Sequence, residues 1–220
     1  METTNEKRTK DWSGNTKSIY VTLGASNHVE EEREENDYYA THPSATEWLC
    51  KLETFSKDVL EPCCGQGHIS KVLEAHGYNV ESFDLIDRGY GKGGVDFLRY
   101  NKTVDCDIVS NPPYKLAQEF IEHAMDIVTE GHKVAMFLKL TFLESSGRKE
   151  LFKKHPPKKI WVSSSRIPCG KNGDFYDRDK EGNIKYDKSG NPKEVSSAVC
   201  YAWFVFEKGY NGPMIVDLFN

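Results

Sequence analysis

The stretch Val59-Leu60-Glu61-Pro62-Cys63-Cys64-Gly65-Gln66-Gly67-His68-Ile69-Ser70 decides the fold of this 220-residue chain. A short apolar run breaks into a Gly-x-Gly loop, and apolar residues then recur at helical spacing (Ile69, Val72, Leu73) before Gly77. We therefore predict a strand, a tight loop and a helix with Gly77 at its C-terminal end. Glycines let a backbone approach a ligand closely, and a helix start offers free N–H groups. The loop lacks the third glycine of the dinucleotide-binding fingerprint, so alone it is a weak signal.

Strands and helices alternate on both sides of this loop. We predict strands at 58–62, 79–85, 95–97, 107–111, 134–138, 160–162 and 199–206, the last two forming a hairpin-like pair. Ser44-x-x-Glu47 is typical of a capping box that opens a helix with Trp48, Leu49 and Leu52 facing inward. Phe120, Ile121, Ala124, Ile127 and Val128 predict an amphipathic helix, and 148–154 a shorter one before Pro156-Pro157. Alternation of this kind predicts a doubly wound α/β fold with ligands at the carboxyl ends of the strands.

Acidic residues end the second and third predicted strands. Asp84 is placed to accept hydrogen bonds from both ribose hydroxyls of a nucleoside cofactor; a solvated turn carboxylate is the alternative interpretation. At Asp96-Phe97, the carboxylate could accept from an adenine amino group while the phenyl ring covers the base. Together with the glycine loop, these residues predict a nucleoside-binding site.

Asn111-Pro112-Pro113-Tyr114 follows the apolar run 107–110. An amino group on a flat ring is a poor nucleophile because its lone pair is delocalised. Acceptors on both of its hydrogens, here the Asn111 side-chain oxygen and the Pro112 carbonyl, can free that lone pair. The prolines bias the residues before them toward extended backbone, and Tyr114 offers a face on which a base can stack. A proline-rich turn without function is the alternative interpretation of these four residues.

With these motifs in this order, the chain resembles the N6-adenine DNA methyltransferases, and looks like the small stand-alone enzymes of phages and prophages. The resemblance covers the chain from about Tyr38 onward. Within it, Tyr38-Tyr39-Ala-Thr41-His-Pro43 resembles the family's N-terminal cofactor segment. The order of the motifs, with the cofactor half first and the catalytic loop second, is similar to the family's gamma arrangement. It implies a mostly parallel seven-stranded sheet, S-adenosyl-L-methionine as cofactor and adenine in DNA as substrate. The implied catalytic residues are Asn111, Pro112, Pro113 and Tyr114; the implied cofactor-binding residues are Tyr39, Thr41, Pro43, Glu61, Pro62, Cys63, Gly65, Gly67, Asp84, Asp96, Phe97 and Asn111.

The chain departs from the family pattern in two respects. Cys63 stands where the family commonly has Phe, and no separate target-recognition domain is present. The same Asn-Pro-Pro-Tyr loop also serves enzymes that methylate RNA adenines or a glutamine amide in release factors, and a non-catalytic decoy with this fold is a further alternative. Cytosine-5 methylation through Cys63 is disfavoured, since that nucleophile should follow the fourth strand.

One polar segment precedes the predicted methyltransferase domain (38–220), and a second interrupts it. Residues 1–37 carry five basic and nine acidic side chains and predict a flexible or surface-laid arm. Residues 170–197 predict a structureless insertion loop, either a substrate-reading element or a surface insertion without a role.

Charge is unevenly distributed along the chain. The net charge is −5, yet Lys139–Lys171 contains nine basic and two acidic residues. Such a segment suits a phosphate backbone or a solvated helix face. The candidate DNA-binding residues are Lys139, Arg148, Lys153, Lys154, Arg166 and Lys171.

Composition indicates a cytoplasmic protein without a membrane partner. No apolar stretch approaches membrane-spanning length, and the first residues do not form a signal peptide. The six cysteines lack paired Cys-x-x-Cys spacing with histidine partners, which disfavours structural zinc and favours reduced thiols. The phage-type resemblance places the protein in the cytoplasm of a bacterial host.

Overall fold

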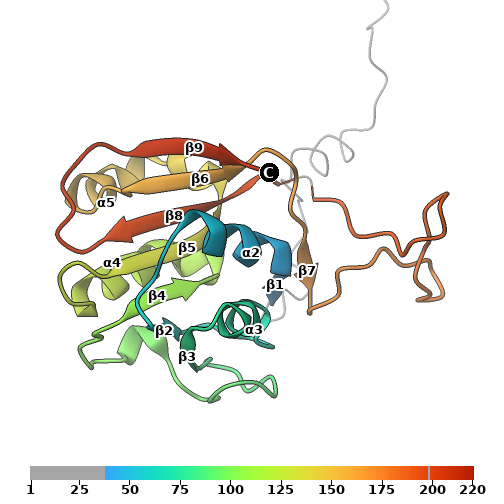
Figure 1. Ribbon diagram of the computed structural model, residues 1–220, viewed down its shortest axis with the longest axis horizontal. Helices are drawn as coiled ribbons and strands as arrows, with labels where there is room; N and C mark the ends of the chain where they lie inside the picture. Colours follow the sequence, from blue (N-terminus) through green and yellow to red (C-terminus); the bar gives the residue numbers. More distant parts are fainter. Residues whose placement is uncertain (1–37, 198) are drawn as a thin grey trace, which may run out of the picture. The chain divides into compact units, whose positions relative to one another are not determined.

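The computed structural model describes residues 38–197 and 199–220, drawn in colour in Figure 1. The arm predicted at 1–37 lies outside the described residues. No helix in the described part of the chain is both long and apolar enough to cross a membrane.

Seven strands form the main sheet in the order β3-β2-β4-β5-β8-β6-β9 (Figure 1). Neighbours β3, β2, β4 and β5 are parallel, β8 runs antiparallel to both β5 and β6, and β9 is parallel to β6. The bounds are β2 Asp58–Glu61, β3 Asn79–Ser82, β4 Asp107–Ser110, β5 Lys133–Lys139, β6 Lys159–Ser163, β8 Tyr201–Glu207 and β9 Ile215–Phe219. The predicted doubly wound, mostly parallel sheet is confirmed. The sequence-based prediction missed edge strand β9.

Helices cover both faces of the sheet. On one face, α2 (Pro43–Leu52) and α3 (His68–Ala75) pack against alternate residues of the strands, and the buried Trp203 indole donates to the Ala45 carbonyl. On the other face, α4 (Ala117–Ile127) and α5 (Lys149–Lys154) pack against the intervening residues. Strand β5 is therefore buried on both sides, as its continuous apolar run predicts.

The helix after the glycine loop ends as predicted. Gly77 has φ +90° just beyond α3, its N–H donates to the Glu74 carbonyl, and the Tyr78 N–H donates to the Leu73 carbonyl. These two bonds form a Schellman motif, in which a left-handed residue satisfies the last helical carbonyls.

The third predicted strand is wrong. Residues 97–99 form a 3₁₀ turn (Phe97–Arg99), and the Asp96 carboxylate caps it by accepting from the Leu98 N–H at 3.0 Å. Asp is a strong N-cap residue, and here this local bond prevails over strand pairing. The other 3₁₀ turns are Tyr114–Leu116, Leu140–Glu144 and Ser146–Arg148.

The predicted capping box is also wrong. The N-cap of α2 is His42, whose Nδ1 accepts from the Ser44 N–H, and Pro43 occupies the first turn. Glu47 instead accepts from His76, the C-cap residue of α3, at 2.7 Å, so it connects α2 to the end of α3. Proline at the first helical position fixes the helix start without a capping box.

The polar segment predicted as structureless is ordered. It begins with β7 (Cys169–Lys171), which pairs antiparallel with β1 (Tyr39–Thr41) in a separate two-stranded sheet. We call residues 172–197 the ribbon; they extend away from the main sheet beyond β7 (Figure 1).

The ribbon contains two tight turns of one pattern, Asp-x-x-Gly-Asn, at 179–183 and 187–191. In each turn the aspartate Oδ1 accepts from the N–H groups two and four residues ahead. The repeated pattern is a turn signal that is visible in the sequence.

Gly77→Ala should lower the free energy of unfolding by about 1 kcal/mol. The left-handed conformation is unfavourable for an L-residue in the folded state, and the lower backbone entropy of the unfolded chain offsets part of this cost. No atom lies within 4 Å of the added Cβ, so steric clash contributes nothing. Gly147→Ala, at a glycine without positive φ, is the control. Urea unfolding measures both variants, and equal stability of the two would contradict this account of the helix end.

Candidate functional site

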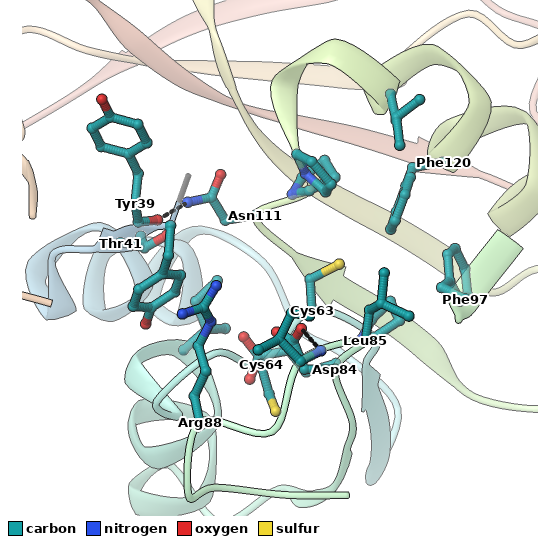
Figure 2. Close-up of a pocket in the computed structure, with 18 of the residues that line it drawn as sticks. Tyr39, Thr41, Cys63, Cys64, Asp84, Leu85, Arg88, Phe97, Asn111 and Phe120 are labelled. Atoms are coloured by element: carbon teal, nitrogen blue, oxygen red, sulfur yellow. Dashed lines mark hydrogen bonds between the residues drawn. The ribbon is translucent and has the colours of Figure 1, made fainter. Parts of the chain in front are cut away.

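A pocket opens at the carboxyl ends of β2, β3 and β4. The chain order reverses here, because β3 and β4 lie on opposite sides of β2, and such switch points are where doubly wound folds bind ligands. Figure 2 shows the side chains that line the pocket. The structure brings together all the predicted catalytic and cofactor-binding residues except Pro43, Gly65 and Gly67.

The two glycines do not face the pocket because aromatic rings cover them. Gly65 and Gly67 have φ +54° and +79°. A Cβ on Gly65 would clash with the ring of Tyr38, and one on Gly67 with the ring of Tyr90. The glycines thus permit close approach, as predicted, but in this structure the approaching groups are side chains.

Tyr38 holds this arrangement through hydrogen bonds. Its hydroxyl accepts from the Gln66 N–H at 3.1 Å and lies 3.1 Å from Nδ1 of His68, the first residue of α3. Burial lowers the pKa of His68, which favours a neutral ring able to accept the hydroxyl proton. The N–H of Gln66, in the loop just before α3, is therefore already satisfied by the protein.

Glu61 ends β2 beneath the pocket and is 1% exposed. Its Oε2 accepts from the Ser70 N–H at 2.9 Å and from the Ser70 hydroxyl. Burial raises the pKa of Glu61 to about 8, against the lowering effect of these bonds. Glu61 forms no ion pair with the residues that the structure describes, so a cationic ligand would favour its ionisation.

Asp84 connects the end of β3 to the glycine loop. Its Oδ2 accepts from the Gly65 N–H at 2.8 Å, and its Oδ1 accepts from the Ile86 N–H at 2.9 Å. A carboxylate has about four acceptor positions, so each oxygen keeps capacity for a further donor. This geometry is compatible with the predicted pair of ribose hydroxyls.

Asp96 and Phe97 differ in their access to the pocket. The Asp96 carboxylate caps its turn and lies 3.3 Å from Arg99. The Phe97 ring is 2% exposed and packs in the core against Phe120 and His123, with centroids 5.2 and 4.9 Å away. Phe97 therefore forms part of the pocket floor.

Asn111 follows β4 and is oriented by β1. Its Nδ2 donates to the Tyr39 carbonyl at 2.9 Å (Figure 2). Because only the amide nitrogen can face a carbonyl, Oδ1 is turned away from Tyr39. Oδ1 is buried and has no hydrogen-bond partner among the described residues, and Thr41 Oγ1, on the same pocket wall, is in the same condition. A buried unpaired acceptor costs about 1–3 kcal/mol, so this site is short of a donor.

The rest of the loop completes this end of the pocket. No N–H of the described residues donates to the Pro112 carbonyl. The Tyr114 hydroxyl lies 3.7 Å from Cys169 Sγ, and Lys139 Nζ lies 5.0 Å from the Tyr114 ring centroid. Burial holds the pKa of Tyr114 well above its usual value, so the hydroxyl stays protonated.

The pocket residues that were not predicted from the sequence include Leu85, Arg88 and Phe120. Leu85 is 58% exposed, and an apolar side chain directly after the strand-end acid was a signal in the sequence. Arg88 lies over the Tyr38 ring at 4.6 Å. That contact depends on how the loop after Asp84 folds back, for which the sequence carries no pattern.

Cys63 packs against the core below the pocket. Desolvation and the nearby acids Asp84 and Glu61 hold the pKa of its thiol well above the usual value. A nucleophilic cysteine needs a thiolate, so the site does not suit covalent catalysis through Cys63.

The six candidate DNA-binding residues are divided between the two ends of the sheet. Lys139 ends β5 beside Tyr114, Lys171 ends β7, and Arg166 donates to the Ser197 carbonyl at 3.1 Å. Arg148 is engaged with the Phe142 carbonyl at 2.8 Å.

Lys154 instead lies 3.7 Å from Asp126 in the last turn of α4, about 15 Å along that helix from the Asn111 loop, and Lys153 pairs with Glu150. Only part of the basic segment can therefore serve a substrate at the pocket.

The chain has the fold of class I S-adenosylmethionine-dependent methyltransferases. A candidate methyltransferase of that class from Listeria monocytogenes superposes with a TM-score of 0.52 and 13% identity over 91% of this chain and 71% of its own. The modification subunit of a candidate type I restriction enzyme from Vibrio vulnificus gives 0.53 and 13% over 84% of this chain. The match spans about half, 48%, of that subunit. No protein-family model and no curated protein sequence matches the chain.

The buried acid predicts a pH dependence of stability. The folded pKa of Glu61, about 8, is raised above its ordinary value of 4.5. The contribution of protonated Glu61 to the free energy of unfolding is therefore fully present below pH 4.5. As the pH rises from 4.5 toward 8, the free energy of unfolding falls by at most about 1.4 kcal/mol per pH unit. Urea unfolding between pH 5 and 8 should show this decline, and Glu61→Gln should remove it. Glu144→Gln, at an exposed carboxylate, should keep it; the same slope in both variants would contradict the assignment.

Proposed function

We propose that this protein transfers a methyl group from S-adenosyl-L-methionine to the N6 amino group of adenine in DNA. One observation carries the proposal. The amide of Asn111, directly after β4 in a pocket that also contains Glu61 and Asp84, is held by one backbone carbonyl. Its buried oxygen has no donor among residues 38–197 and 199–220. An exocyclic amino group is a donor of the type this oxygen lacks.

The residues present fit the proposed cofactor. Three acids line the pocket, Glu61, Asp84 and Asp96, and a cationic sulfonium compound complements them. Asp84 would bind the ribose hydroxyls with its remaining acceptor capacity, and Asp96 the adenine amino group. Leu85 and Phe97 supply apolar surface for the ring. When bound, the cofactor supplies an electrophilic methyl group on sulfur.

The chain's own contribution is to orient the accepting nitrogen. Asn111 Oδ1 and the Pro112 carbonyl would each accept one amino hydrogen, which draws the nitrogen toward tetrahedral geometry and frees its lone pair. Such alignment and fixed dipoles account for most of the rate in reactions of this type. Since Oδ1 is shielded in this structure, the substrate reaches it through a local shift of the Asn111 side chain or of β1 above it.

A nucleic acid is favoured over a protein amide by the surroundings of the loop. Lys139, Arg166 and Lys171 lie near Tyr114 and the ribbon base, where a phosphate backbone would pass. The name of the Vibrio vulnificus structure, a restriction-enzyme modification subunit, accords with this choice. The ribbon is the proposed substrate-reading element, and a bacterial host cytoplasm the proposed location.

Parallel incubations with labelled S-adenosylmethionine test the substrate class. DNA, RNA and a glutamine-containing release-factor fragment are each offered to the protein, and label is expected in DNA as N6-methyladenine. Label in RNA or protein would replace this proposal with one of the two alternatives that share the loop. Absence of S-adenosylmethionine binding by calorimetry would favour a non-catalytic decoy.

Asn111→Ala should abolish methyl transfer while the affinity for S-adenosylmethionine stays within a few-fold, because the amide serves the acceptor nitrogen. Single-turnover assays and calorimetry measure the two quantities separately. Asn101→Ala, at an exposed asparagine outside the pocket lining, is the matched control and should retain activity. Wild-type turnover by Asn111→Ala would show the catalytic assignment to be wrong.

A further inference from the structure

A second cavity, of about 440 Å³, lies between the small β1–β7 sheet, the base of the ribbon and the start of β8. Its walls include Tyr39, Cys169, Lys171, Tyr176, Arg178 and Tyr201. The volume is within the range of small-molecule sites. None of the residues assigned to the cofactor, apart from Tyr39, belongs to this cavity.

The second cavity adjoins the catalytic loop. Tyr39 lines both cavities, and its carbonyl is the group that orients Asn111. Cys169 Sγ lies 3.7 Å from the Tyr114 hydroxyl, and the Tyr201 ring centroid is 6.0 Å from that of Tyr114. A chain whose reacting base enters at Asn111 would place its next unit at this cavity.

The cavity walls combine flat apolar surface with positive charge. The Tyr176 side chain is 41% exposed, so part of its ring surface is accessible for stacking. The Arg178 guanidinium is paired with Asp174, whereas the Lys171 ammonium forms no ion pair with the described residues. One aromatic platform and one uncommitted cation match the base and the phosphate of a nucleotide.

We propose that this cavity binds the nucleotide next to the target adenine in a single-stranded segment, with its base on Tyr176 and its phosphate at Lys171. The inference rests on the proposed DNA substrate and adds a specificity-determining site built by the ribbon. Its consequence is that the base beside the target, and not only the target itself, contributes to affinity.

Tyr176→Ala and Lys171→Ala test the two halves of the site. Binding of a fluorescent single-stranded oligodeoxynucleotide with one adenine is measured by anisotropy in the presence of S-adenosylhomocysteine. Tyr176→Ala should weaken this binding about tenfold or more, as loss of one base–aromatic stack does. Lys171→Ala should reduce the slope of log K against log salt by about 0.7, the value for one phosphate contact on a single strand.

The matched control is Tyr186→Ala, which removes a 62%-exposed tyrosine from the same ribbon outside the cavity and should bind as wild type does. Calorimetry with S-adenosylmethionine should give unchanged affinity for all three variants. If wild type methylates DNA but Tyr176→Ala binds within twofold of it, the cavity assignment is wrong and the proposed function stands. If wild type instead methylates only RNA or a protein amide, both proposals are overturned.

Discussion

The rest of the site depends on the absence of side chains at Gly65 and Gly67. Both residues have positive φ, and each is covered by a tyrosine ring that would clash with a Cβ. Tyr38 comes from the segment before β1 and Tyr90 from the loop after Asp84, so the glycine loop is the surface on which two distant parts of the chain meet. Alanine at either position would meet both a strained backbone and an occupied space.

The ribbon rests on the same loop from a third direction. A Cβ on Gly173 would clash with the Gln66 side chain, and the Phe175 ring packs edge-on between His42 and His68, 5.0 and 5.4 Å from their centroids. The segments before the sheet and late in the chain are therefore stacked over the start of α3. This stacking explains why β1 and β7 pair at the mouth of the pocket although 128 residues separate the paired Thr41 and Cys169.

The sequence predicted those features that depend on local pattern. Strand β2, helix α3 and its Gly77 end follow from periodicity and from one residue that tolerates positive φ, and the Asn111 loop was found because its residue types carry the chemistry. Strand β9 was missed although Ile215, Val216 and Leu218 are apolar; they are 45–64% exposed at a sheet edge, so their pattern is not that of a buried strand. The segment at 95–97 was misjudged because a side-chain cap competes with strand pairing. The Tyr38 and Arg88 contacts could not be predicted, since they arise only after distant segments have packed together.

The hydrogen bond from Asn111 to the Tyr39 carbonyl connects the two cavities physically. It fixes the amide and leaves Oδ1 buried, with no donor in the part of the chain that the structure describes. The accepting carbonyl belongs to Tyr39 of β1, whose side chain is a wall of the second cavity. Any movement of β1 that uncovers Oδ1 must also move Tyr39, and through the pairing of Tyr39 with Lys171 it must move β7. Where a shift of β1, rather than of the Asn111 side chain alone, uncovers this oxygen, its exposure is coupled to occupation of the second cavity. A ligand with higher affinity for the displaced position of β1 would shift the equilibrium toward the state in which the oxygen is exposed. The size of that shift is set by the ligand's difference in affinity for the two positions of β1.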